Sequence, residues 1–197
     1  AKYTPTVTPV TPTADPTTST DIQGQTQTGK PTFTPGNPDV PMDDDTPATF
    51  EDGSTTKVIP GEGTYTVAPD GTVTFTPEPN FTGRGTGVTV QRVDKNNTPA
   101  TADYTPVIVG VKPTAKPADS TDVQGATQEH PVTFNDSKTT IDGVEKKVPI
   151  DPTTYTLLDE NGNPATEVPA KDATGKVVGT YTVKNVDGKA VAVFTPT

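Results

Sequence analysis

The chain has 197 residues, 28% of them hydrophobic and 6% aromatic, and a formal charge of −10 at pH 7. The acidic balance argues against nucleic acids and anionic membranes as partners, because both are bound through basic patches. The sequence contains no apolar run of about 18 residues, the length that a membrane-spanning helix requires. It also contains no cysteine, which excludes disulfides and a thiolate nucleophile.

Strand signals and turn residues alternate along the first half of the chain. No segment keeps a 3.6-residue apolar period, so no helix is predicted. Residues 63–67 and 72–75 alternate polar and apolar side chains around an Asp-Gly turn, which predicts a β-hairpin. Further strands are predicted over residues 87–93 and 100–109, with a polar turn at 94–97 between them.

Long stretches of the sequence occur twice. Residues 10–27 return with few changes as residues 111–128, and Tyr3-Thr-Pro5 returns as Tyr104-Thr-Pro106, both at an interval of 101 positions. This period exceeds the roughly 20–50 residues of solenoid repeats. It suits one whole small domain instead.

The interval between the copies grows in the second half. Gly179–Val183 repeats the segment that begins at Gly63 at an interval of 116 positions. An insertion is therefore expected between Phe134 and Gly179, and we interpret it as an additional hairpin around the turn at 159–162.

These patterns predict an all-β fold of tandem, elongated repeat domains. Each domain is expected to be a small antiparallel β-sandwich with immunoglobulin-like or related Greek-key connections. Residues 1–9 are predicted to be the closing strand of a preceding repeat or a linker, and residues 10–110 the first complete repeat domain. Residues 111–197 are predicted to be a second repeat that is truncated at its C-terminus.

The predicted cores consist of the apolar residues that alternate along the strands. In the first domain they are Phe33, Phe50, Val58, Tyr65, Val67, Val73, Phe75, Phe81, Val88, Val90 and Tyr104. In the second they are Phe134, Val148, Tyr155, Leu157, Val178, Tyr181, Val183 and Phe194.

Four short motifs carry a family resemblance: Ser19-Thr-Asp-Ile-Gln-Gly-Gln-Thr-Gln27, Phe75-Thr-Pro77, Tyr104-Thr-Pro106 and Gly179–Val183. In order and spacing they resemble the CshA-type fibril repeat of streptococcal and related Gram-positive surface adhesins. The resemblance covers nearly the whole chain. It implies a structural stalk that projects an adhesive tip from the cell wall for adhesion to the host or to other bacteria.

The resemblance also implies the setting of the parent protein. Such a parent is secreted, anchored to the peptidoglycan of the cell wall, extracellular and linked to virulence. Neighbouring repeats of the same polypeptide are the expected partners, and other regions bind host extracellular-matrix proteins.

Two alternative functions stay open at this stage. The repeat itself could bind a host protein or glycan, which would need an exposed aromatic or arginine cluster; the sequence offers scattered tyrosines with Arg84 and Arg92. The chain could also act as a disordered entropic spacer, since it is rich in proline and poor in apolar residues.

No enzyme activity and no cofactor are predicted. The single histidine, His130, precedes Pro131 in an expected loop, and no serine lies in a nucleophile motif. The acids that could form a carboxylate pair lie in turns, where such side chains bond the local backbone: Asp70, Asp159, Glu160 and Asp187.

Two weak candidate sites remain. Asp43, Asp44 and Asp45 carry oxygen ligands of the kind that Ca²⁺ prefers, although a solvated acidic loop is the favoured interpretation and no metal site is predicted. Stalk domains similar to this one carry Thr–Gln ester or Lys–Asn isopeptide cross-links, for which Thr20 with Gln23, or Lys57 with Asn80, are candidates. The favoured alternative is that Thr20 and Gln23 bond the backbone at a domain junction.

Overall fold

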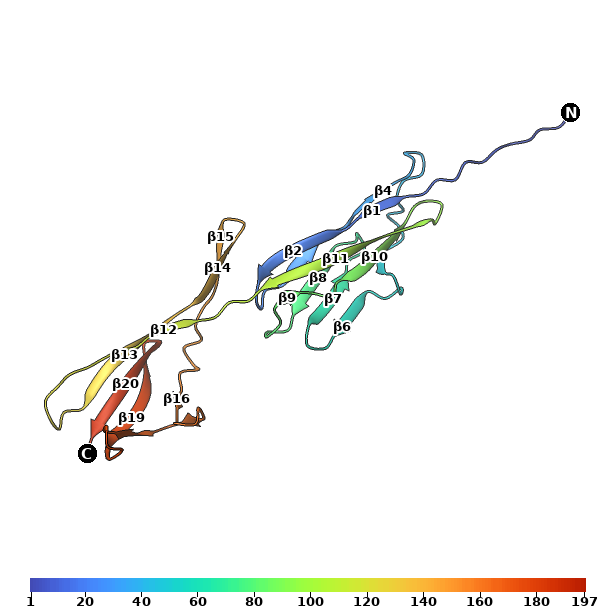
Figure 1. Cartoon of the computed structure of the whole chain (residues 1–197). Helices are drawn as coiled ribbons and strands as arrows, with labels where there is room; N and C mark the ends of the chain where they lie inside the picture. The colour runs from blue at the N-terminus through green and yellow to red at the C-terminus, as the bar shows by residue number, and fades with distance from the viewer. The chain divides into compact units, whose positions relative to one another are not determined.

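The computed structural model describes all residues 1–197, and each of its twenty elements is a β-strand. The chain divides into two compact units (Figure 1). Unit 1 comprises residues 1–111 with 140–146, and unit 2 comprises residues 112–139 with 147–197. No helix able to cross a lipid bilayer occurs in the structure.

Unit 1 contains a five-stranded sheet in the order β2-β11-β10-β5, with β9 added beside β11. Its longest strand, β11, alternates outward residues with inward Ala100, Ala102, Tyr104, Pro106 and Ile108. The strands are β2 (Thr17–Ile22), β5 (Thr49–Phe50), β9 (Gly83–Arg84), β10 (Val88–Val93) and β11 (Pro99–Val109).

A four-stranded sheet in the order β3-β8-β7-β6 forms the second layer of unit 1 (Figure 1). Its centre is the predicted hairpin, in which Tyr65 faces Phe75 across the antiparallel ladder. The strands are β3 (Gln27–Gly29), β6 (Thr56–Ile59), β7 (Gly63–Val67) and β8 (Val73–Pro77); β1 (Thr13–Asp15) and β4 (Thr32–Thr34) pair separately.

Both layers of unit 1 contribute to one core, as expected for a β-sandwich. Eight predicted core residues are buried: Phe50, Tyr65, Val67, Val73, Phe75, Val88, Val90 and Tyr104. Phe33 and Phe81 pack against this core while partly exposed. The prediction for Val58 is wrong, because its side chain is 63% exposed on β6 and its neighbour Ile59 packs on the core instead.

Unit 2 is built on one five-stranded sheet in the order β12-β13-β20-β19-β18. The strands are β12 (Thr114–Lys116), β13 (Gln128–Asn135), β18 (Val168–Lys171), β19 (Val177–Val186) and β20 (Lys189–Pro196). Two short ladders lie outside the large sheets: β14 (Ser137–Ile141) with β15 (Val144–Val148), of which residues 140–146 belong to unit 1, and β16 (Leu157–Leu158) with β17 (Pro164–Ala165) in unit 2. The β16–β17 pair is the predicted additional hairpin, with its turn at Asp159–Gly162.

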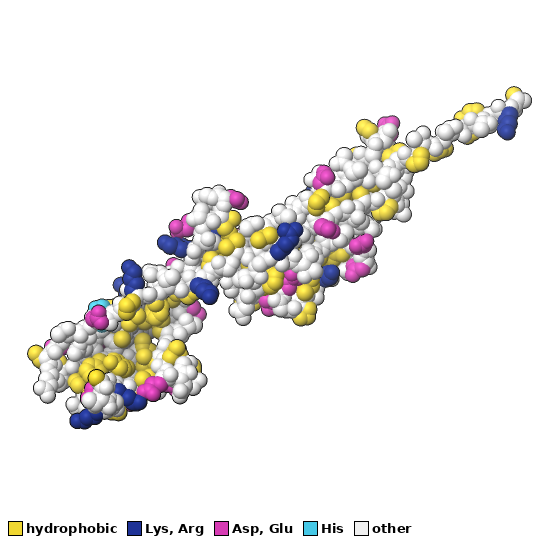
Figure 2. Space-filling view, in the orientation of Figure 1, with side chains coloured by type: hydrophobic (Ala, Val, Ile, Leu, Met, Phe, Trp, Pro, Cys, Tyr) yellow, Lys and Arg dark blue, Asp and Glu magenta, His cyan; other side chains and the backbone are white.

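The predicted core residues of unit 2 are less buried than those of unit 1. Phe134 is 42% exposed and Tyr181 is 44% exposed, which corrects both predictions, and the other six predicted residues are half-buried. The fully buried apolar residues here are Ala170, Ala190 and Val191. Figure 2 shows hydrophobic side chains gathered at the surface of this unit, because no second large sheet covers them.

Candidate functional site

The first and last long strands of unit 1 lie side by side in the same direction. β2 pairs with β11 in parallel, in a register that runs from Thr17 opposite Tyr104 to Ile22 opposite Val109. Every other strand pair described for the chain is antiparallel. The chain thus reaches this ladder at its Thr17 end and leaves it at its Val109 end.

A polar cluster beneath this ladder joins both sheets of unit 1. Ser19 Oγ donates to Gln27 Oε1 at 2.6 Å, and the Tyr104 hydroxyl lies 2.6 Å from Ser19 Oγ. The Gln27 amide donates in turn to the carbonyl oxygen of Val107 at 3.1 Å. Since Gln27 and Tyr104 are buried, these bonds satisfy polar groups whose isolation would cost about 1–3 kcal/mol each.

Burial also keeps the two central tyrosines protonated. It raises the pKa of the Tyr65 hydroxyl to about 12, an effect that the nearby Glu62 carboxylate reinforces. The pKa of Tyr104 is raised as well, again chiefly by burial. Tyr65 accepts a hydrogen bond from the Gly87 backbone at 3.1 Å, while Glu62 accepts one from the Thr86 backbone. The bonds among Ser19, Gln27 and Tyr104 are therefore made by uncharged side chains.

Gln23 forms hydrogen bonds with the backbone at the C-terminal end of β11. Its backbone N–H donates to the Val109 carbonyl at 2.9 Å, and its side-chain Oε1 accepts from the Val111 N–H at 3.3 Å. Its Nε2 donates to the Pro79 carbonyl at 3.0 Å. One glutamine therefore links the end of β2, the end of β11 and the loop after β8.

The candidate cross-linking residues are not gathered into a buried reaction site. Thr20 is exposed on the outer face of β2, and the Gln23 amide is engaged by backbone groups. Lys57 lies exposed on β6, and Asn80 lies exposed in the loop after β8. The cross-links stay predictions. The Gln23 side chain bonds backbone groups of unit 1, and the role of Thr20 and Gln23 at a domain junction stays a prediction as well.

The three consecutive acids form ion pairs with two basic residues, Lys95 and Arg92. Asp43 accepts from the Thr46 hydroxyl at 2.7 Å and from Lys95 Nζ at 3.0 Å. Asp44 bonds Arg92 at 2.7 Å, and Asp45 lies 3.5 Å from Lys95. No group of three or more metal-ligating side chains converges here or elsewhere, so the Ca²⁺ hypothesis has no assembled ligand set.

We expect Asp43 to contribute to acid sensitivity. The Thr46 hydroxyl and then Lys95 lower the pKa of Asp43 from 3.8 to about 2. A depressed pKa stabilises the fold above the unfolded value and is lost as the pH falls through the folded value. Asp43→Asn should therefore lower the unfolding temperature at pH 7 and flatten its decline between pH 4 and about 2.

Thermal unfolding followed by circular dichroism at several pH values measures this effect. The matched control is Asp45→Asn, because the Asp45 side chain is 94% exposed. An unchanged acid profile for Asp43→Asn would contradict the assignment.

Unit 2 repeats half of the polar cluster. Ser120 Oγ donates to Gln128 Oε1 at 2.6 Å, as Ser19 does to Gln27, and Asp122 caps Val123 as Asp21 caps Ile22. His130 lies in strand β13 rather than in the loop that the sequence suggested, and its Nδ1 lies 2.7 Å from the Pro131 carbonyl.

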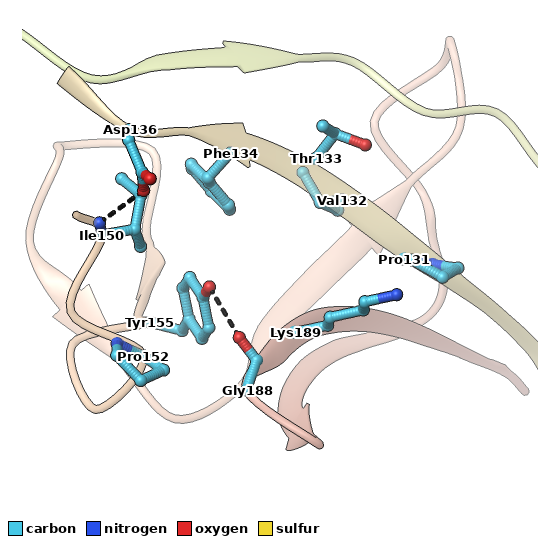
Figure 3. A pocket seen from close by; sticks show the side chains of 10 residues that line it. All are labelled: Pro131, Val132, Thr133, Phe134, Asp136, Ile150, Pro152, Tyr155, Gly188 and Lys189. Atoms are coloured by element: carbon cyan, nitrogen blue, oxygen red, sulfur yellow. Dashed lines mark hydrogen bonds between the residues drawn. The ribbon is translucent and has the colours of Figure 1, made fainter. Parts of the chain in front are cut away.

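A separate cavity of about 480 Å³ opens on unit 2 (Figure 3). Phe134 and Tyr155 stack in it with ring centroids 5.5 Å apart. Two of its polar side chains bond backbone groups that also line it: Asp136 accepts from the Ile150 N–H at 2.7 Å, and Tyr155 donates to the Gly188 carbonyl at 3.0 Å. Thr133 and Lys189 line the cavity as well.

Together, the two-layer β fold and the twice-occurring Ser–Gln motif define the chain as a tandem β-repeat protein. Residues 9–108 and 110–197 each match the family model described as the surface adhesin CshA repetitive domain, and the chain belongs to this family.

Two solved structures are similar to the chain. Repeat domain 13 of the fibrillar adhesin CshA from Streptococcus gordonii, solved by NMR, shares 61% identity over 36% of this chain and 90% of its own, with a TM-score of 0.21. The N-terminal eight Ig domains of Down Syndrome Cell Adhesion Molecule match 95% of this chain and 23% of their own at 12% identity, with a TM-score of 0.38. A search of curated proteins finds no match.

The sequence pattern missed the residues that form the polar cluster. The prediction chose Thr20 and Gln23 from the repeated motif, whereas Ser19, Gln27 and Tyr104 meet inside the fold. The missed signal was the two-residue period of a strand, which turns Ser19 inward when Thr20 faces solvent. The recurrence of Ser19 and Gln27 as Ser120 and Gln128 pointed to the same pair.

Proposed function

We propose that the chain is a load-bearing stalk segment of a surface adhesin, without catalytic activity. The parent protein would be secreted and anchored to the cell wall, where it contributes to adhesion and virulence, and its stalk would hold an adhesive region away from the cell. Membership of the family of surface adhesin CshA repeats supports this proposal. The similar domain from Streptococcus gordonii comes from a fibrillar adhesin.

The parallel β2–β11 ladder is the observation that carries the mechanical part of the proposal. Tension along the polypeptide pulls β2 from its Thr17 end and β11 from its Val109 end. Because the strands are parallel, these forces act along the ladder in opposite directions. The hydrogen bonds are then loaded together in shear, whereas an antiparallel hairpin pulled at its open end yields one bond at a time.

The alternatives receive less support from the structure. Arg92 is bonded to Asp44 and lies over the Phe33 ring at 5.9 Å, whereas Arg84 is on β9, so the two arginines form no cluster. A disordered spacer would not form the buried core of unit 1. We also propose a boundary between repeats near residue 110, which the matched ranges 9–108 and 110–197 support.

Single-molecule pulling with a proline variant in β2 tests the load-bearing proposal. In a parallel ladder, the backbone N–H groups of alternate residues point toward the partner strand. The Gln23 N–H bonds the Val109 carbonyl, so the Asp21 N–H also points toward β11 and the Thr20 N–H points away from it. Asp21→Pro removes one ladder donor and should lower the unfolding force of unit 1, with a loss of about 1–3 kcal/mol in its free energy of unfolding.

Two controls separate backbone from side-chain effects. Thr20→Pro also introduces a proline into β2 but removes no ladder hydrogen bond. Asp21→Ala removes the aspartate side chain but keeps the backbone N–H donor. Equal unfolding forces for Asp21→Pro and Thr20→Pro would contradict a load-bearing role for the ladder.

A further inference from the structure

We propose that Asn161 is a site of spontaneous modification, at which the side-chain amide is hydrolysed and part of the product carries its backbone through the former side chain. The reaction needs only water as a second reactant. It follows from the sequence and hydrogen bonds of one turn and does not depend on the proposed stalk function.

Asn161 differs from the other asparagines in the residue that follows it. Of the eight asparagines in the chain, only Asn161 precedes a glycine. The others precede proline, phenylalanine, asparagine, threonine, aspartate or valine. Because glycine has no Cβ, the backbone nitrogen of Gly162 is the least shielded nitrogen that follows any asparagine of the chain.

The nitrogen of Gly162 is the nucleophile of the proposed reaction. It attacks Cγ of Asn161, and closure of a five-membered succinimide ring breaks the bond from Cγ to Nδ2. The Nδ2 amine takes up the proton released by the Gly162 amide and leaves as ammonia. An intramolecular attack of this kind gains from the fixed proximity of its two groups.

Water then opens the succinimide at one of its two carbonyl carbons. Addition of water at Cγ breaks the new bond from Cγ to the Gly162 nitrogen and leaves aspartate at position 161. Addition at the backbone carbonyl carbon breaks the original peptide bond instead. The chain then continues through Cβ and Cγ, which is isoaspartate.

The folded turn presents Asn161 to solvent but holds the attacking nitrogen. Asn161 is exposed in the turn between β16 and β17. The Gly162 N–H donates to the Asp159 carbonyl at 3.0 Å. The Asp159 carboxylate accepts from the Asn161 and Asn163 N–H groups at 2.9 Å each. The reaction therefore requires the turn to open.

The ladder behind this turn is short enough to open locally. It consists of two residue pairs, Leu157 with Ala165 and Leu158 with Pro164, and it lies outside the large sheets. Leu158 is 58% exposed, and Pro164 has no N–H to donate. Segments with few buried contacts open at free energies well below that of global unfolding. Opening therefore releases the Gly162 nitrogen while the rest of the unit stays folded.

The turn at 94–98 in unit 1 provides a contrasting case. Asn97 is also exposed, with a positive φ of 60°. It precedes the β-branched Thr98, whose N–H donates to the carboxylate of the fully buried Asp94 at 2.9 Å. Attack there needs the nitrogen of a branched residue and the loss of a hydrogen bond to a buried group, so Asn97 should react slowly.

The products would change the turn in charge and in length. Both place a carboxylate next to Glu160, which already pairs with Lys171 at 2.5 Å, in a chain of formal charge −10. Isoaspartate also inserts one methylene group into the backbone of the turn. We expect this longer backbone to break the hydrogen bonds between Asp159 and the turn, and the short ladder with them.

Peptide mapping by mass spectrometry tests the site on the whole chain, incubated at pH 7 and sampled over weeks. We expect conversion of amide to acid at Asn161 to be at least about tenfold faster than at any other asparagine, with both aspartate and isoaspartate in the product. Asn163 is the internal control, because it is exposed in the same turn and precedes Pro164, whose nitrogen has no proton to release. Conversion at Asn161 that is no faster than at Asn163 or Asn97 overturns the proposal.

Two variants test the mechanism. Asn161→Gln should be converted much more slowly, because its attack must close a six-membered ring. Asp159→Ala removes two hydrogen bonds of the turn and should speed conversion at Asn161 about fivefold. An unchanged rate in Asp159→Ala would overturn the claim that opening of the turn limits the reaction.

Nuclear magnetic resonance of the aged chain tests the effect on the hairpin. The cross-strand contact between Leu157 and Ala165 should be lost in the isoaspartate form and kept in the variant Asn161→Asp, which carries the added charge alone. Retention of this contact in the isoaspartate form would overturn the predicted loss of the ladder.

Discussion

Tyr104→Ala is expected to unfold unit 1 or leave it marginally stable. The side chain is fully buried, contacts Tyr65 and supplies the hydroxyl that bonds Ser19. Truncation of a buried aromatic residue costs about 3–5 kcal/mol, a large share of the roughly 5–15 kcal/mol that stabilises a typical domain. Urea unfolding followed by circular dichroism measures the loss.

Two controls assign this loss to the aromatic ring and its burial. Tyr104→Phe removes only the hydroxyl and should cost about 1 kcal/mol. Tyr3→Ala makes the same truncation at the repeated position, where the side chain is 87% exposed, and at dilute protein concentration should change stability by less than about 0.5 kcal/mol. Similar losses for Tyr104→Ala and Tyr3→Ala would refute the structural role of the buried Tyr104 ring.

Gly29→Ala is expected to destabilise unit 1 by about 1–3 kcal/mol, the usual cost of overpacking a core. A Cβ at this position would overlap the Tyr104 ring, which has no solvent-facing route of escape because it is fully buried. The neighbouring exposed residue provides a control, Thr28→Ala, that should have little effect. Chemical denaturation of each variant gives the two free energies of unfolding.

A double-mutant cycle with Tyr104→Ala identifies the cause of the Gly29→Ala effect. Residues in contact couple by about 0.5–3 kcal/mol, so the added methyl group should cost much less once the ring is absent. A cost that stays the same in the Tyr104→Ala background would mean that the methyl group acts elsewhere, through the strand itself.

Local sequence patterns were sufficient to predict the central hairpin of unit 1. The strands at 63–67 and 73–77 follow strict alternation around an Asp-Gly turn, and their inward residues are buried. Val58 was mispredicted because Val58 and Ile59 are both apolar, so alternation alone does not say which one faces inward. The β14–β15 hairpin was missed, although Asp142 and Gly143 both adopt positive φ at its turn.

Those local patterns could not predict which distant strands pair with each other. Residues 17–22 are rich in threonine and serine and contain one buried residue, Ile22, so nothing local marks them as the parallel partner of β11. A parallel pair has no connecting turn that would reveal it in the sequence. The polar cluster depends on this pairing, and for that reason sequence reasoning selected Thr20 and Gln23 rather than Ser19 and Gln27.

Unit 2 shows how far a repeated sequence implies a repeated environment. Phe134 and Tyr181 were predicted as core residues because they repeat Phe33 and Tyr65, yet both are exposed by more than 40%. Burial depends on an opposing layer, and the five-stranded sheet of this unit has no second large sheet packed against it.

The most direct test of the central claim compares two directions of pulling on unit 1. Attachment through Pro16→Cys and Lys112→Cys loads the β2–β11 ladder from its opposite ends, because the two residues flank those strands. Attachment through Pro16→Cys and Asn97→Cys pulls both strands from the same end and peels them apart. Forced unfolding reports the kinetic barrier, and we predict a clearly higher unfolding force in the first geometry. Equal forces in both directions would contradict the claim that the parallel ladder bears the load.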